Sequence, residues 1–560
     1  MLHYVLCLLV YCYPYLGHVE IYTKTGNLKG KWMVSRNEKN YLAFEGIPYA
    51  HPPVGHLRFM DPVPIEKWNG VWDATHPGDP CVQWNYLENG PTEGSEDCLH
   101  LSVYTPAPLK KPIYTGLFKN WKKIKYIKDK LALKNKKLLP VMVYIHGGCF
   151  EFGSGESPRE GADYFMDEPV VLVKINYRLG ALGFLSFEEK ELSGNFGLKD
   201  QAVALKWLQD NIIYFGGDPR RITLFGENAG AASINFHLLS PYSRGLFHKA
   251  IASSGSGYSP WALAKNGRAR STAIRTAHLV GCLRNTTREM VGCLRSVDAY
   301  YLVDQRRTMI TSYVDPVCLY VPVIDHGANH PFLPNSLSKL QPAKVPVLFG
   351  INSADGLLKT SFYTKYGQFD WTSIDYHFTH YFKEILLLNP EIIGIEEEIA
   401  EIRQFYFGFD ELGEYSFHNL TNLFTDGWFY LPMIQAFRNH PETVYLYYLD
   451  YLGENSYADV YGSRRIIDGA CHRDETIYLF NSTKYPKFHQ LSSNDEHFSK
   501  QLVRTWADFA RFGDPVKSQG LNIGDWRHRD YLEIGNLGFL IKKDLLQDVI
   551  KFWFRLTMMT

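Results

Sequence analysis

The stretch that decides the fold runs Thr223-Leu-Phe-Gly-Glu-Asn-Ala-Gly230 and continues as Ala231-Ala-Ser-Ile-Asn-Phe-His-Leu-Leu239. It begins as an apolar strand and ends as an apolar helix, so a sharp turn must lie between them. Gly226 and Gly230 flank that turn, as is expected where backbone packs tightly against its neighbours. A nucleophile elbow has the pattern Gly-x-Ser-x-Gly in the same strand–turn–helix context, and here Asn228 stands in the place of the serine.

Short apolar runs rich in β-branched residues alternate with helical patterns along the rest of the chain. Nearly continuous apolar strands with helices between them predict a mostly parallel sheet covered by helices on both faces. No internal repeat and no long flexible linker divides the chain, so we expect residues 18–560 to form one α/β domain. The runs expected to be strands are 139–145, 170–175, 221–225, 250–252, 345–350 and 444–448.

Composition excludes some classes of protein. Of the 560 residues, 45% are hydrophobic and 21% are charged, which is typical of a globular chain with a large core and not of a disordered or fibrous one. Lys plus Arg number 59 and Asp plus Glu number 59, so the chain lacks the overall positive charge of many nucleic-acid-binding proteins. We therefore expect no nucleic-acid partner.

One segment departs from this neutral balance. Residues 107–139 contain eleven Lys and one Asp, and Leu117, Trp121 and Ile124 recur in it at helical spacing. A basic amphipathic helix of this kind would bind an anionic surface. The alternatives are a solvated surface insertion between two strands, which we favour, and an intron translated by error.

The first 17 residues contain no Asp, Glu, Lys or Arg and are too short to span a bilayer as a helix. They predict a secretory signal peptide, with an N-terminal anchor as the alternative. A secreted, extracellular protein forms disulfides, and seven of the nine cysteines follow the signal. Glycosylation is expected at the three sequons, which begin at Asn285, Asn419 and Asn481.

Further motifs resemble the type-B carboxylesterase/cholinesterase family, whose members have the α/β-hydrolase fold. The resemblance runs from about Gly30 to the C-terminus. It is carried by the elbow and by four other segments: Ser95-Glu-Asp-Cys-Leu-His-Leu-Ser-Val-Tyr-Thr-Pro106, Asn195-Phe-Gly-Leu-Lys-Asp-Gln201, Phe215-Gly-Gly-Asp-Pro219 and Gly245-Leu-Phe-His-Lys-Ala250. The chain departs from the family at His100, where Tyr or Thr is usual, and in the length of the basic segment.

The resemblance implies a catalytic trio in the chain order nucleophile, acid, histidine. The nucleophile position is Asn228. The acid precedes a glycine that follows a strand, which implies Asp355, and the histidine lies in a Gly-x-x-His segment, which implies His472. No cofactor and no metal is implied.

The resemblance also implies an oxyanion hole made of backbone N–H groups. These would come from the stretch His146-Gly-Gly-Cys149 and from the residue after the nucleophile, that is, from Gly148, Cys149 and Ala229. Cys149 replaces a glycine, so its side chain would narrow the site. We interpret Cys149 as a small packed residue, and a free catalytic thiol is the alternative.

Two disulfides follow from the resemblance, Cys81 with Cys98 and Cys282 with Cys293. The remaining cysteines, Cys149, Cys318 and Cys471, are then expected to be buried thiols. Arg58 and Glu96 match a structural ion pair of the family.

Asn228 changes the expected chemistry. In an active member a serine oxygen attacks the ester and the histidine accepts its proton. An amide nitrogen has its lone pair delocalised, so Asn228 supplies no nucleophile, although it can donate a hydrogen bond to His472. Asn also tolerates the positive φ of an elbow better than Ser does.

Three interpretations follow. The first is a secreted pseudo-esterase that binds a hydrophobic ester-like ligand or a protein partner without efficient turnover. The second is an active serine-type carboxylic ester hydrolase, in which Asn228 is an error or is rescued, for example by deamidation to Asp. The third is a cholinesterase-like adhesion protein that uses the basic segment.

Overall fold

A computed structural model describes residues 18–88, 90–106, 138–265, 267–309, 318–365, 370–385, 394–462 and 467–556. The expected signal peptide lies outside these ranges, and so does the lysine-rich segment apart from its last two residues. Within the described ranges no helix is both long enough and apolar enough to cross a membrane.

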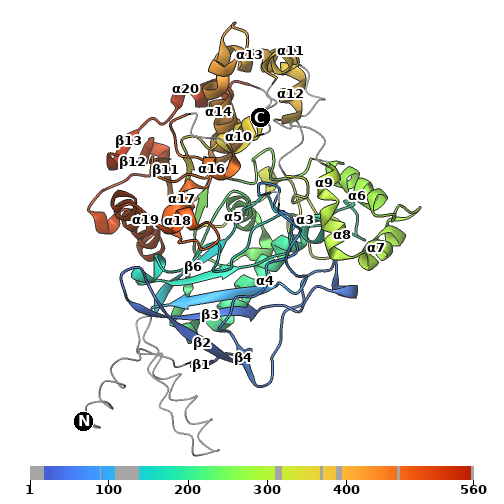
Figure 1. The fold of residues 1–560 in the computed structure, drawn as a ribbon, viewed down its shortest axis with the longest axis vertical. Helices are drawn as coiled ribbons and strands as arrows, with labels where there is room; N and C mark the ends of the chain where they lie inside the picture. Colours follow the sequence, from blue (N-terminus) through green and yellow to red (C-terminus); the bar gives the residue numbers. More distant parts are fainter. Residues whose placement is uncertain are drawn as a thin grey trace, which may run out of the picture.

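A large mixed sheet forms the centre of the molecule, and its middle strands are parallel (Figure 1). All six predicted strands are present in this parallel part, and their side chains are almost entirely buried, as their continuous apolar sequences predicted. In sheet order the parallel strands are β7 (Val171–Ile175), β6 (Leu139–Ile145), β8 (Gly217–Glu227), β9 (Lys249–Ser253), β10 (Val347–Asn352), β11 (Val444–Asp450) and β12 (Asp530–Gly535).

Antiparallel strands extend the sheet at both ends. They were not among the predicted strands, because their apolar positions are interrupted by polar ones. One end carries β1 (Val19–Tyr22), β2 (Asn27–Val34), β3 (Asn40–Pro48) and β5 (His100–Thr105), and the other end carries β13 (Gly538–Lys543). The short strand β4 (Val71–Asp73) pairs with β2 in parallel.

Three long helices pack against the middle of the sheet: α4 (Phe196–Asn211), α5 (Ala229–Leu239) and α19 (Ser493–Phe512). The ends of α19 follow its sequence. The Ser492 side chain accepts a hydrogen bond from the Asp495 backbone N–H at the start, and Gly513 ends the helix with φ 75°.

Two groups of helices lie away from the sheet in Figure 1. One group is α6 (Arg268–Leu279), α7 (Thr287–Ser296), α8 (Ala299–Asp304) and α9 (Arg306–Met309). The upper group contains α10 (Leu357–Lys365), α11 (Trp371–Tyr376), α12 (Phe378–Ile385), α13 (Ile395–Phe407), α14 (Phe417–Thr425) and α20 (Gln547–Trp553). Shorter helices are α3 (Gly180–Phe184), α15 (Leu431–Phe437), α16 (Ala458–Tyr461), α17 (Asp474–Leu479) and α18 (Pro486–His489).

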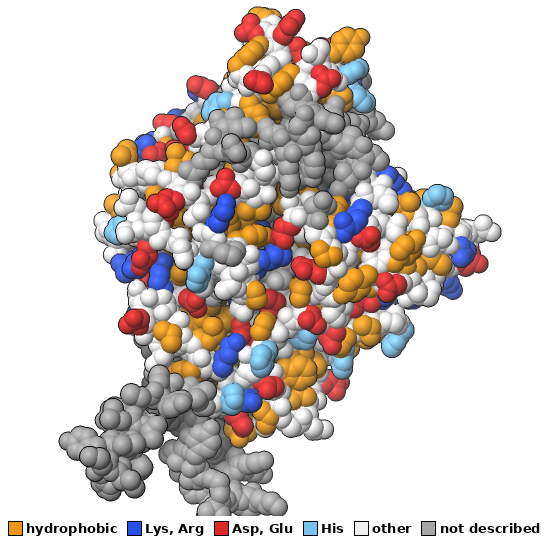
Figure 2. Space-filling view, viewed as in Figure 1, with side chains coloured by type: hydrophobic (Ala, Val, Ile, Leu, Met, Phe, Trp, Pro, Cys, Tyr) orange, Lys and Arg blue, Asp and Glu red, His pale blue; other side chains and the backbone are white. Residues whose placement is uncertain are grey.

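The chain between α14 and α15 is a π-helical turn over Asp426–Tyr430. Such turns insert an extra residue into a helix and often lie at functional sites. On the face seen in Figure 2, acidic, basic and hydrophobic side chains are interspersed among the described residues.

Candidate active site

The predicted elbow lies at the turn between β8 and α5. Asn228 is the one residue between strand and helix, and its backbone has φ 54° and ψ −121°. A Cβ at Gly226 would lie 2.3 Å from the carbonyl oxygen of Ile145, and a Cβ at Gly230 would lie 2.0 Å from the same atom. Both positions therefore require glycine, because the neighbouring strand β6 leaves no space for a side chain.

The structure brings the three predicted site residues together. His472 Nδ1 lies 2.7 Å from Asp355 Oδ1, and His472 Nε2 lies 2.9 Å from Asn228 Nδ2. The amide nitrogen can only donate, so Nε2 must accept, and Nδ1 carries the proton that is donated to Asp355. The predicted hydrogen bond from Asn228 to the histidine is therefore present.

Asp355 follows the carboxyl end of β10 and is held by further donors. Its Oδ2 accepts hydrogen bonds from the Asn352 backbone N–H at 2.9 Å and from the Ser254 hydroxyl at 2.7 Å. Ser254 has φ 50°, a conformation that turns the chain directly after β9. The sequence reasoning missed both partners. The only available signal was that both positions lie at the ends of parallel strands, where sites of such sheets collect.

The oxyanion hole is already filled by the side chain of Asn228. The backbone N–H of Gly148 donates to Asn228 Oδ1 at 3.2 Å, and that of Cys149 donates to the same oxygen at 2.9 Å. Two N–H donors require an acceptor, so the amide oxygen must face the loop and the amide nitrogen must face His472. The third predicted donor, Ala229, is the first residue of α5 and is buried.

A buried ionic network holds the loop that carries these donors. Gly147 N–H donates to Glu227 Oε1 at 3.0 Å, and Arg473 Nε lies 3.2 Å from that oxygen. Arg473 also pairs with Glu160, with Nη2 and Oε1 3.2 Å apart. His146 stacks on Tyr177, and burial lowers the pKa of His146 to about 3, so its ring is neutral.

Cys149 is buried and packed, as predicted, but the prediction that Cys149 and Cys318 are buried thiols was wrong. Cys149 and Cys318 form a disulfide across 169 residues of sequence, so neither is a free thiol and the catalytic-thiol alternative is excluded. The spacing of these cysteines gave no local signal, because only the folded chain brings Cys149 beside Cys318. Cys471 is a buried free cysteine, as predicted, and burial raises the pKa of its thiol.

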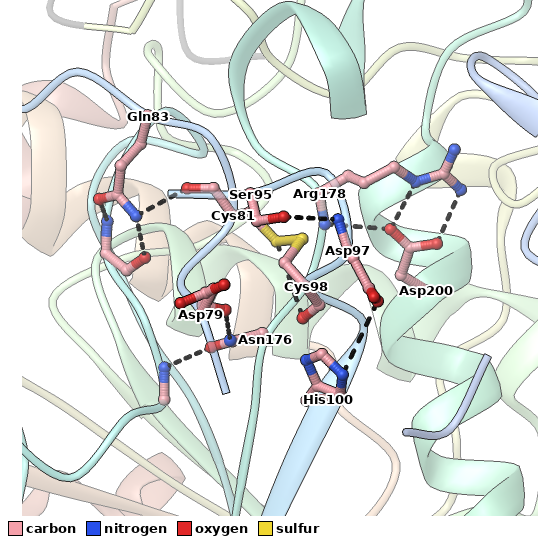
Figure 3. The surroundings of a disulfide bond; sticks show 12 residues. Asp79, Cys81, Gln83, Ser95, Asp97, Cys98, His100, Asn176, Arg178 and Asp200 are labelled. Atoms are coloured by element: carbon pink, nitrogen blue, oxygen red, sulfur yellow. Dashed lines mark hydrogen bonds and ion pairs between the residues drawn. A yellow bond between two sulfur atoms is a disulfide. The ribbon is translucent and has the colours of Figure 1, made fainter. Parts of the chain in front are cut away.

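The two predicted disulfides, Cys81–Cys98 and Cys282–Cys293, are confirmed. Figure 3 shows the surroundings of the first. There His100, the departure from the family pattern, is buried, and its Nε2 lies 3.8 Å from Asp97 Oδ1.

The predicted ion pair of Arg58 with Glu96 is also present. The guanidinium binds both carboxylate oxygens, at 2.7 and 2.6 Å.

The three sequons differ in accessibility. Asn285 is exposed and Asn419 is half-buried on α14. Asn481 is buried, and its side-chain nitrogen donates to Asp163 Oδ2 at 2.6 Å. A glycan requires its asparagine nitrogen to reach solvent, and Asn481 is only 9% exposed, so we keep the expectation only for Asn285 and Asn419.

An aromatic ring packs on the histidine, and a buried carboxyl group lies near Asp355. The Phe429 ring, from the π-helical turn, lies 4.7 Å from the His472 ring, and Trp261 lies 6.0 Å from Phe429. Glu475 accepts a hydrogen bond from the Asn352 amide at 2.6 Å, and burial raises the pKa of Glu475 to about 8. Among the described residues no cluster of three or more His, Cys, Asp or Glu side chains is placed to hold a metal ion.

The parallel sheet, the elbow after β8 and the chain order of acid and histidine define the α/β-hydrolase class. Comparison with known proteins places the chain within that class. The model of the carboxylesterase family matches residues 18–553, and the chain belongs to that family.

Individual relatives agree with this assignment. Juvenile hormone esterase of Tribolium castaneum is 32% identical over 96% of this chain and 93% of its own length. Esterase E4 of Myzus persicae is 33% identical over 89% of this chain and 86% of its own length. The crystal structure of juvenile hormone esterase from Manduca sexta, with OTFP covalently attached, superposes with a TM-score of 0.79 at 25% identity and covers 96% of this chain and 99% of that one.

Proposed function

We propose that this protein is a secreted member of the carboxylesterase family that binds a hydrophobic ester-like ligand without efficient turnover. The observation that carries the proposal is the position of the Asn228 amide. It lies where the family resemblance places a serine, its oxygen accepts both N–H groups of the oxyanion loop, and its nitrogen presents an N–H to His472.

Each of these contacts opposes ester hydrolysis. His472 has no hydroxyl to deprotonate, and an amide nitrogen is not a nucleophile because its lone pair is delocalised. A substrate carbonyl also finds the donors of Gly148 and Cys149 already occupied. Loss of the nucleophile alone costs on the order of 10⁶ in turnover.

The surroundings support an apolar ligand. The Phe429 ring lies 4.7 Å from the His472 ring, Trp261 packs on the Phe429 ring at 6.0 Å, and such rings bind hydrophobic groups. The relatives include juvenile hormone esterases, so juvenile hormone is the first ester to test as a ligand. Three disulfides, together with the predicted signal peptide, support secretion, because disulfides persist in oxidising compartments.

An active ester hydrolase is the second candidate, and one observation favours it. Asp355 and His472 keep a 2.7 Å contact, and Ser254 and Asn352 hold the aspartate in place. Because only the nucleophile is missing from this trio, a change of Asn228 to a nucleophilic residue would be enough to restore hydrolysis.

The test compares binding with turnover. The purified full chain should quench its tryptophan fluorescence on adding juvenile hormone and return the ester intact. It should hydrolyse p-nitrophenyl esters no faster than a His472→Gln variant, and a fluorophosphonate probe should leave residue 228 unlabelled. A phosphonyl adduct at residue 228, found by peptide mass spectrometry, would contradict the proposal and support the second candidate.

A further inference from the structure

The amide of Asn228 is held as a substrate amide would be held in a hydrolase site. Two backbone N–H groups donate to its carbonyl oxygen, at 3.2 and 2.9 Å, and its nitrogen lies 2.9 Å from an imidazole nitrogen. The donors withdraw electrons from the carbonyl carbon and stabilise the oxyanion that forms when a nucleophile adds to it. The imidazole is placed to protonate a departing amine.

We propose that Asn228 is a self-modification site, at which the trio hydrolyses its own side-chain amide and converts Asn228 to Asp. A water molecule adds to Cγ and gives a proton to His472 Nε2, while the carbonyl electron pair moves onto Oδ1. The oxyanion then collapses, the C–N bond breaks, and His472 returns the proton to the departing nitrogen, which leaves as ammonia. One water is consumed and no oxidant or reductant is needed.

The hydrogen bonds present before the reaction show which contact must break for it to begin. His472 Nε2 accepts a bond from the amide in the resting state, so it must release that bond to take a proton from water. Asp355 holds the opposite ring nitrogen at 2.7 Å and stabilises the imidazolium that forms. Asn228 keeps 4% of its surface accessible to solvent and Asp355 keeps none, so the attacking water must enter a buried site. The reaction occurs once per chain, because the aspartate stays in the site.

Two other buried asparagines serve as internal controls, because each has only part of this arrangement. Asn176 Oδ1 accepts a backbone N–H from Gly155 at 2.8 Å, but its nitrogen faces the Asp79 carbonyl and the Glu156 carboxylate and no imidazole (Figure 3). Asn352 donates to Cys471 and Glu475, and its buried Oδ1 has no hydrogen-bond donor. Asn176 has one N–H donor on its oxygen where Asn228 has two, Asn352 has none, and neither nitrogen is bonded to an imidazole, so both should remain asparagine.

A competing route is available at the same carbon. In ordinary deamidation the backbone nitrogen of the following residue, here Ala229, attacks Cγ and forms a succinimide. Its hydrolysis yields a mixture of aspartate and isoaspartate. The proposed route uses water directly and yields aspartate alone, so the products distinguish the two.

The experiment follows residue 228 by peptide mass spectrometry in the purified full chain. During incubation at neutral pH in oxygen-18 water, Asn228 should become aspartate with one oxygen-18 atom in its side chain, while Asn176 and Asn352 remain amides. His472→Gln should slow the conversion by about 10²–10⁴-fold, the usual contribution of a general acid–base. His237→Gln is the matched control, because His237 is equally buried but bonds Gln201 and Ser243; it should leave the rate unchanged.

Three results would overturn the proposal: an unchanged amide at residue 228 in the folded protein, isoaspartate at that position, or an equal rate in folded His472→Gln. If His472→Gln does not fold, the wild-type chain decides alone, because conversion of Asn228 no faster than that of Asn176 and Asn352 would overturn it. The proposal goes beyond ligand binding. Self-modification is measured as a mass change at residue 228, whereas the proposed function is measured by binding and recovery of the ester. Either proposal can therefore fail without the other.

Discussion

Replacing Asn228 by serine should restore ester hydrolysis, because the structure retains every other part of the trio. The imidazole and carboxylate are 2.7 Å apart, and the two oxyanion donors lie within 3.2 Å of the present side chain. Serine supplies a hydroxyl to His472 and has no carbonyl to fill the hole. Removing a nucleophile costs on the order of 10⁶ in kcat, so we expect a gain of about 10⁴–10⁶. That gain corresponds to about 5–8 kcal/mol of transition-state stabilisation.

The assay is hydrolysis of p-nitrophenyl butyrate by the folded variant, with thermal unfolding as a check of integrity. Asn228→Ala is the matched control, since it empties the oxyanion hole in the same way but supplies no hydroxyl. The Asn228→Ser chain with His472→Gln should also be inactive, which would assign the hydroxyl's activation to the histidine.

A folded Asn228→Ser variant with no more activity than Asn228→Ala would refute this reasoning. The oxyanion loop would then be the next suspect, because Cys149 replaces a glycine there and is tied to Cys318. Activity that appears only after Cys149→Gly and Cys318→Ala are added would locate the defect in the loop and not in the nucleophile.

Three other predictions test separate features. Replacing Cys149 and Cys318 together by alanine should lower the free energy of unfolding by about 3–5 kcal/mol in urea, because their bridge closes a loop of 169 residues; an unchanged midpoint would contradict this. Burial raises the pKa of Asp426 from 3.8 to about 7, so between these two pH values the folded chain holds a proton that the unfolded chain has released. The free energy of unfolding should therefore fall by about 4 kcal/mol as the pH rises from about 4 to 7. Asp426→Asn should remove this slope between about pH 4 and 7 and keep a partner for the Tyr406 hydroxyl, which bonds the carboxyl group at 2.6 Å. Deleting residues 112–136 should abolish salt-sensitive binding to heparin or anionic vesicles and leave the thermal midpoint within a few degrees; a full chain that does not bind at low salt would exclude a role for this segment at anionic surfaces.

The sequence predicted features whose signal is local and missed those that depend on distant parts of the chain. Six of the seven parallel strands were predictable because strands buried on both faces are continuous apolar runs, whereas β12, which contains Asp530 and Glu533, was missed. The glycines of the elbow were predictable because a close backbone approach excludes side chains. Strands β1 to β5 were missed because polar residues interrupt their apolar sequences, even in β3 and β5, whose side chains are almost all buried.

Partners that are distant in the sequence could not be predicted, for a physical reason. Nothing near Cys149 distinguishes Cys318 from Cys471 as its partner, because the choice depends on how the sheet folds. Likewise Ser254 holds Asp355 only because β9 and β10 are neighbours in the sheet. The hydrogen bond from Asn228 to His472 was predicted because two polar groups at one site must find partners. The second contact, in which the amide oxygen accepts the N–H groups of the oxyanion loop, could not be predicted because the sequence does not show how that loop is oriented.

That second contact explains how the site remains ordered without a serine. A buried N–H or imidazole nitrogen without a partner costs about 1–3 kcal/mol, and loss of the nucleophile exposes three such groups: the N–H groups of Gly148 and Cys149 and the Nε2 of His472. Asparagine has an acceptor and a donor on one planar group, and here it satisfies all three. Alanine would leave all three to solvent or unpaired, and aspartate would require a protonated histidine. Under the proposal that Asn228 stands in for a nucleophilic serine, its amide stabilises the geometry of the site without supplying a nucleophile, and the same contacts polarise that amide toward attack by water.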